Sequence, residues 1–304
     1  MSYSGALSKV APTESRMAWL STTPLKIHPV INQQREEVLT FLASRPLHTV
    51  FMAGLIRDNG LVSRLNRGSF YACRDAKGYL EGVALIGHAT LVEARSEASL
   101  RAFARLAQEY RRAHVIMGER DKIQHFWNYY SAAGQSPRLA CRELLLELRW
   151  PAEVREQVDG LRQASSEHLE PVMQVQAQLA YEESGVNPLE ADPVGFRRRC
   201  VRRVEQGRVW VWAEGERLIF KADIISDTPE VIYLEGLYVH PEERGKGYGL
   251  RCLSQLSRSL VARAGSVCVL VNEQNQRGQN FYRRAGYKLQ SCYDTIYLRN
   301  SEPS

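Results

Sequence analysis

The sequence lacks any apolar run near the roughly 20 residues that a membrane-spanning helix requires. Its first twenty residues contain no apolar core of the length found in secretory signals. We therefore expect residues 1–22 to form a flexible tail, and we expect a cytoplasmic protein with no membrane partner.

Paired cysteines are also missing. The six cysteines are widely scattered and none forms a CxxC pair, which argues against a zinc site or a dithiol redox motif. Within apolar segments a free cysteine behaves as a small hydrophobic residue. We expect reduced thiols and no bound metal.

The charge balance does not single out a partner. A net charge of +6 and a pI near 9 permit an anionic partner such as nucleic acid, a charged surface or a polyanionic cofactor. The densest basic cluster, Phe196–Val204, distributes its arginines all round a predicted helix, which is typical of a solvated segment. Nucleic acid is therefore an unlikely partner.

The order of predicted elements occurs twice along the 304 residues. Gly68–Ala94 predicts three strands and Ser96–Ala113 a helix, while Gly207–Ile225 predicts a hairpin that precedes another strand and the helix Tyr248–Ala264. The string HFWNYYSAAG in the first half corresponds to NFYRRAG in the second. We infer two α/β units with a mixed sheet, over residues 23–150 and 151–304, joined by a polar linker near 149–160.

One segment is present only in the second half. YLEGLYVHPEERGKGYGLRCLSQL, Tyr233–Leu256, has glycines at three alternate positions directly before a predicted helix. The first turn of a helix offers unpaired N–H groups and partial positive charge, and glycines let an anion approach them. Arg244 and Lys246 add charge suited to phosphate. The segment predicts a phosphate-binding loop.

Two common phosphate loops do not fit. A Walker A loop requires GxxxxGK[ST], which the sequence does not contain. The dinucleotide fingerprint GxGxxG requires a glycine where Leu250 stands and should follow its strand directly, whereas His240–Arg244 intervene.

The segment resembles the acetyl-CoA loop of the GNAT acetyltransferase superfamily, with signature [QR]xxGx[GA]. Arg244, Gly247 and Gly249 match it, and NQRGQNFYRRAGY downstream resembles a second family motif that includes Asn275 and Tyr282. The resemblance covers about residues 161–298. It implies two tandem GNAT-like acyl-CoA N-acyltransferase folds of a bacterial two-domain type, with a degenerate first unit.

The resemblance also implies acetyl-CoA as the cofactor. Leu237 would supply an oxyanion N–H group and Val239 would pair with the pantetheine arm. The full set of expected cofactor-binding residues is Leu237, Tyr238, Val239, Arg244, Gly245, Lys246, Gly247, Tyr248, Gly249, Asn275 and Tyr282.

Catalytic roles are expected for two side chains. Glu235 lies among apolar residues of a predicted strand, where burial would raise its pKa toward that of a general base; a structural glutamate paired with an arginine is the alternative. Tyr282 resembles the family's general acid, or else packs as an aromatic with Phe281. Glu182 and Glu183 are the rival carboxylates for the role of base, and together with Asn187 they are expected to line the substrate entrance.

The function implied is acetyl transfer from acetyl-CoA to a primary amine by direct attack in a ternary complex. The amine could belong to a small molecule, a peptide N-terminus or a protein lysine. Two alternatives stay open: a tandem GNAT that transfers aminoacyl groups from tRNA or builds a thiol cofactor, and a non-catalytic acyl-CoA sensor.

Overall fold

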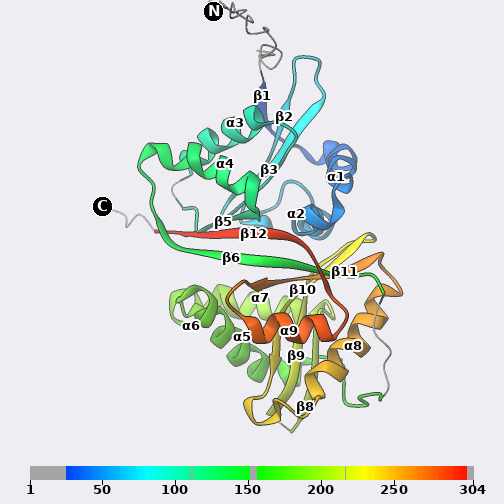
Figure 1. Cartoon of the computed structure of the whole chain (residues 1–304). Coiled ribbons are helices and arrows are strands. Elements are labelled where there is room, and N and C mark those ends of the chain that lie inside the picture. The colour runs from blue at the N-terminus through cyan, green and yellow to red at the C-terminus, as the bar shows by residue number, and fades with distance from the viewer. Residues whose placement is uncertain (1–24, 111, 151–155, 216, 300–304) are drawn as a thin grey trace, which may run out of the picture.

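The computed structural model describes residues 25–110, 112–150, 156–215 and 217–299. The expected tail, residues 1–22, and the central part of the expected linker, 151–155, lie outside them. Figure 1 shows two groups of helices, one from each half of the chain, on either side of two long strands that cross the middle of the molecule. Within the described residues, no helix is long and apolar enough to span a membrane.

The first half supplies six strands and four α-helices among the described residues. In chain order they are β1 Lys26–Pro29, α1 Arg35–Ala43, α2 Pro46–Asn59, β2 Gly68–Arg74, β3 Leu80–Gly87, β4 Ala89–Ala94, α3 Glu97–Gln108, β5 Val115–Glu119, α4 Arg120–Tyr130 and β6 Pro137–Leu148.

The second half repeats this order with one additional short helix. Its elements are β7 Arg162–Gln163, α5 Leu169–Ser184, α6 Pro188–Ala191, α7 Pro193–Glu205, β8 Val209–Glu214, β9 Arg217–Asp227, β10 Val231–Val239, α8 Tyr248–Val261, β11 Ser266–Asn272, α9 Gln276–Arg284 and β12 Lys288–Leu298. The predicted strands in Gly68–Ala94, the hairpin in Gly207–Ile225 and the helix after the glycine segment are confirmed.

The described strands form one mixed 12-stranded sheet, in the order β1-β2-β3-β4-β5-β12-β6-β11-β10-β9-β8-β7. The last strand of each half has therefore crossed over. β6 of the first half pairs with β11 of the second, and β12 of the second half pairs with β5 of the first. β6 and β12 pair antiparallel with each other at the centre of the molecule (Figure 1).

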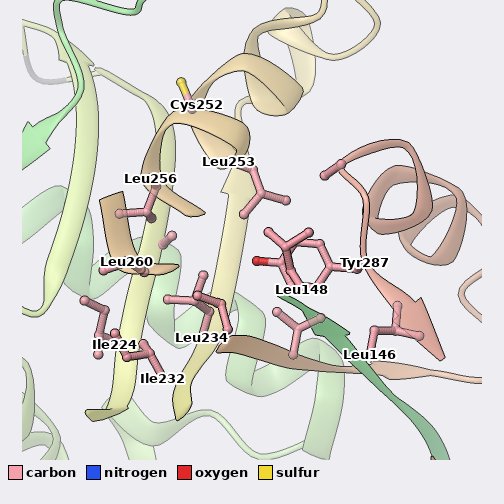
Figure 2. Packing of buried hydrophobic residues seen from close by; sticks show 14 of the residues in the cluster. Leu146, Leu148, Ile224, Ile232, Leu234, Cys252, Leu253, Leu256, Leu260 and Tyr287 are labelled. Atoms are coloured by element: carbon pink, nitrogen blue, oxygen red, sulfur yellow. The ribbon is translucent and has the colours of Figure 1, made fainter. Parts of the chain in front are cut away.

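Packing of apolar side chains in the cores of the two halves explains why these strands cross over. Leu144, Leu146 and Leu148 of β6 are buried in the second half's core, against α8 and Tyr287. Figure 2 shows Leu146 and Leu148 on the side of the cluster where Tyr287 lies. Burial of a leucine side chain stabilises the fold by roughly 1.5–3 kcal/mol, so these side chains bind β6 to the second half strongly.

β12 makes the reciprocal contribution, because Ile296 and Leu298 are buried in the core of the first half. The unit boundary at residue 150 thus remains a prediction, which rests on the repeated order of elements in the sequence. In the folded protein each core contains a strand from the other repeat.

Residues 151–304 expressed alone should consequently fail to fold into a stable monomer. Removal of β6 deletes three core leucines and exposes the edge of β11, and an unpaired apolar edge promotes aggregation. Size-exclusion chromatography and thermal unfolding would show aggregates or a loss of cooperative unfolding. Co-expression of residues 1–150 as a separate chain should restore a soluble complex; a stable, cooperative monomer of 151–304 would contradict the prediction.

Candidate active site

The sheet opens between β10 and β11. The two strands pair in parallel only from Val231 with Ser266 to Leu234 with Val269. Beyond Leu234, β10 carries a bulge: Glu235 pairs with Asp223 of β9 and Tyr238 with Lys221, so Gly236 and Leu237 together oppose one residue. A bulge redirects a strand, and this one separates β10 from β11.

A cavity of about 1090 Å³ lies in this opening. Its walls come from both halves of the chain, because β6 contributes to them beside β10, β11, β12, α5, α8 and α9. Its lining includes Cys141, Glu143, Glu182, Glu183, Glu235, Leu237, Tyr238, Val239, Arg244, Gly245, Gly247, Gly249, Asn275, Tyr282 and Thr295.

The glycine loop borders the cavity with an open helix end. Gly245 and Gly247 have φ of +86° and +85°, a conformation that costs other residues about 1–2 kcal/mol. A Cβ atom on either would meet no described atom within 4 Å, so the space before α8 is free. No side chain of the described residues caps α8. The exposed N–H groups of its first turn are suited to an anion.

In the first half, a side chain caps the start of the corresponding helix, α3. The Ser96 hydroxyl caps α3, accepting a hydrogen bond from the Ser99 N–H group at 3.3 Å. The donors that α8 leaves open are thus partly satisfied in α3, and the contrast supports a binding role for the glycine loop.

The basic residues of the loop differ in their surroundings. Arg244 Nε donates to the Val239 carbonyl oxygen at 2.9 Å, which braces the loop against the end of β10. The Lys246 ammonium group pairs with Glu243 at 2.9 Å. Arg244 lines the cavity, whereas Lys246 does not. Tyr248 also lies outside the lining, with its ring 5.0 Å from that of Trp212.

Glu235 is the fifth residue of β10 and lies directly before the bulge. No hydrogen bond reaches its carboxylate from the described residues. Desolvation raises the pKa of Glu235, although the nearby charges of Arg203 and Lys221 oppose that increase. The alternative of a structural glutamate paired with arginine is weakened, because Arg203 bonds instead to Asp223 at 2.8 Å.

A buried lysine holds the bulge in shape. Lys221 is fully buried, and its Nζ lies 2.8 Å from Asp223, 2.7 Å from the Gln176 side-chain oxygen and 3.2 Å from the Gly236 carbonyl oxygen. Gly236 has φ +61°, and a Cβ atom there would lie 2.9 Å from Nζ. The ammonium group is therefore used inside the protein to fix the backbone beside Glu235.

Two further carboxyl groups line the same cavity. Desolvation raises the pKa of Glu143, and the charge of Glu235 adds to this effect, while a hydrogen bond donated by Thr295 opposes it. The pKa of Glu183 is raised as well, by desolvation and by the charges of Glu235 and Glu143. Three glutamates from β6, α5 and β10 thus influence one another across the cavity.

The second motif is also brought to the cavity. The Tyr282 ring packs against Phe281 and Tyr287, at centroid distances of 5.4 and 5.7 Å. Burial raises the pKa of Tyr282, so its hydroxyl stays protonated and able to donate. Asn275 caps α9 by accepting from the Gly278 N–H group at 2.8 Å.

Glu182 and Glu183 line the cavity as the sequence analysis expected, but Asn187 does not. The Asn187 side chain caps α6, accepting from the Leu189 N–H group at 3.0 Å. Cys141 and Glu143, which also line the cavity, were not among the residues expected from the sequence. The LLLEL run marks a buried strand, and nothing local reveals which sheet neighbour it selects.

The first half holds a closed counterpart of this site. Glu93 occupies the fifth position of β4, as Glu235 does in β10, but it forms ion pairs with Arg45 (3.2 Å) and with Lys122. Glu93 lines neither the cavity of about 1090 Å³ nor the cavity of about 50 Å³ that Leu91 and Val92 of β4 help to line. A carboxylate neutralised by two cations and lying outside both cavities is not available to a substrate.

Comparison with known proteins agrees with this geometry. Residues 205–289 match the family model described as an acetyltransferase (GNAT) domain. The chain therefore carries a GNAT acetyltransferase domain. That domain is characteristic of acyltransferases, and the match covers β8, β9, β10, the glycine loop, α8, β11 and α9. No curated protein matched the chain at a significant level.

Solved structures extend the likeness in fold to 90–92% of the chain. An acetyltransferase of the GNAT family from Colwellia psychrerythraea has a TM-score of 0.57 at 11% identity, over 91% of this chain and 100% of its own. A GCN5-related N-acetyltransferase from Sphaerobacter thermophilus has a TM-score of 0.57 at 14% identity, over 90% and 95%.

A tandem GNAT protein from the clavulanic acid biosynthesis pathway has a TM-score of 0.56 at 14% identity, over 92% of this chain and 100% of its own. At such identities these likenesses concern the fold. The two-unit fold that contains the GNAT domain of this protein is therefore also found in solved structures.

Proposed function

We propose that the protein transfers an acetyl group from acetyl-CoA to a primary amine, with the second half as the active unit. One observation supports this best: the uncapped, glycine-lined start of α8 and the unpartnered Glu235 carboxylate border the same cavity of the described chain. An anion site and a candidate proton acceptor are thus combined where two strands diverge.

The residues present suit acetyl-CoA. The open N–H groups at the start of α8 suit its diphosphate, and the divergent edge of β10, Leu237–Val239, offers backbone groups to an extended amide-containing arm. Bound acetyl-CoA would supply an activated acetyl thioester. The Val239 carbonyl is already engaged by Arg244, so we expect its N–H side or its neighbours to serve the arm.

The protein's own groups would then handle protons. An alkyl ammonium ion has a pKa near 10.4 and must lose a proton before it attacks a thioester. We propose that Glu235, whose pKa is raised, takes that proton. The Leu237 N–H group, in the bulge, is proposed to donate to the carbonyl oxygen, and the Tyr282 hydroxyl to protonate the departing sulfur.

A paired assay tests this function. Calorimetry should show binding of coenzyme A, and thiol release from acetyl-CoA should depend on an added primary amine. Binding of coenzyme A without thiol release across a broad amine panel would favour an acyl-CoA sensor. Absence of binding would contradict both.

Replacement of Tyr282 by phenylalanine should lower kcat by about tenfold or more and leave coenzyme A affinity within about twofold. A thiolate with pKa near 8.5 leaves without full protonation, which limits the expected loss. Steady-state thiol release measures the change.

Tyr287→Phe is the matched control. Its hydroxyl bonds to that of Ser257 at 2.9 Å, in the core and outside the cavity lining. Equal effects of the two substitutions on kcat would assign Tyr282 to packing.

A further inference from the structure

The cavity lining is rich in carboxylates. Four glutamates, Glu143, Glu182, Glu183 and Glu235, line it from β6, α5 and the bulge of β10. A fifth, Glu243, forms ion pairs with Arg217 and with Lys246. The lining arginines of the described chain, Arg244, Arg277 and Arg284, form no ion pair with the first four glutamates.

Within the described chain, these four carboxylates form no ion pair. Glu143 accepts a hydrogen bond from Thr295, and Glu182 from Gln178 at 2.8 Å; both donors are neutral. The internal cations whose charges reach Glu235, Arg203 and Lys221, are both paired with Asp223. Neutral donors satisfy oxygen atoms but leave the negative charge uncompensated.

One reacting amine does not account for this charge. A single carboxylate suffices to accept its proton, and further carboxylates without partners destabilise one another unless a cation lies between them. A substrate that carries a second permanent positive charge would supply that cation. The cavity wall itself therefore indicates more than one ammonium group on the acceptor.

We propose, building on the proposed function, that the acceptor is a diamine or polyamine. One nitrogen, deprotonated by Glu235, forms the C–N bond with the acetyl carbonyl carbon as the C–S bond breaks. The sulfur leaves with the bonding electron pair and takes up a proton. The second nitrogen keeps its proton and lies among Glu143, Glu182 and Glu183.

Putrescine and n-pentylamine test this proposal, because a methyl group replaces the second ammonium group in an otherwise matched chain. With the full-length protein saturated by coenzyme A, calorimetry should give putrescine a Kd at least about tenfold lower, since one charge contact of about 1.4 kcal/mol corresponds to a factor of ten. Equal affinities would overturn the proposal, even if both amines were acetylated.

Glu183→Gln should reduce the preference for putrescine to within about threefold, as measured by the ratio of kcat/KM for the two amines. Glu170→Gln on the same helix is the control, because Glu170 is exposed, bonds to Gln174 and does not line the cavity. A preference unchanged by Glu183→Gln and by Glu143→Gln would also overturn the proposal. Tighter putrescine binding without acetyl transfer would support it and contradict the proposed function.

Discussion

Gly247→Glu should weaken binding of coenzyme A by at least about 100-fold. Gly247 has φ +85°, which strains any side chain, and its Cβ would project into the open space before α8. A carboxylate there would occupy the proposed diphosphate site and repel the ligand, and like-charge contact in a partly buried site costs several kcal/mol. Isothermal titration calorimetry with coenzyme A measures the change.

Gly78→Glu is the control for backbone strain. Gly78 lies in a turn of the first half at φ +90°, and a Cβ atom added there would also meet no described atom within 4 Å. The two substitutions should lower the melting temperature similarly, and only the one at Gly247 should abolish binding. Retention of normal coenzyme A affinity by Gly247→Glu would place the diphosphate elsewhere.

Glu235→Gln should reduce kcat by about 10²–10⁴-fold, the usual contribution of a positioned general base. Coenzyme A affinity should stay within about twofold, because the carboxylate lies away from the glycine loop. Thiol release at saturating amine measures the first quantity and calorimetry the second. A variant that kept more than a third of wild-type kcat would transfer the role of base to Glu183 or Glu143.

The pH dependence provides a second readout on Glu235. Desolvation raises its pKa above the ordinary value of 4.5, so the active, deprotonated form accumulates only as the pH rises through that higher value. The wild-type profile of kcat/KM should contain an ascending limb that disappears in Glu235→Gln. Glu170→Gln should retain it.

The contribution of Glu235 to the free energy of unfolding should fall as the pH rises, whereas the activity should increase. A carboxyl group whose pKa is raised in the folded state contributes stability below its unfolded pKa and loses it as the pH rises through the folded value. Glu235→Gln should therefore melt at a higher temperature than wild type near pH 8, by roughly 2 °C, and at a similar temperature below about pH 4.5. That result would also show that the variant is folded when its activity is measured.

Local signals in the sequence determined much of this protein. Apolar runs bounded by turn residues predicted the strands of Gly68–Ala94 and Gly207–Ile225, because such runs are typical of buried strands. Gly245 and Gly247 predicted the open helix start, because only glycine adopts such positive φ angles readily. The GNAT resemblance followed from those motifs, and the family match over residues 205–289 confirmed it.

Only the tertiary structure decided which strands are neighbours. The apolar pattern of β6 fixes which of its faces is buried but does not identify the sheet position that receives it. Long-range packing of Leu146 and Leu148 against α8 resolves that choice and carries Glu143 into the cavity of the other half. Likewise, the raised pKa of Glu235 comes from its burial, against the opposing charges of Arg203 and Lys221, and residues distant in the chain provide these surroundings.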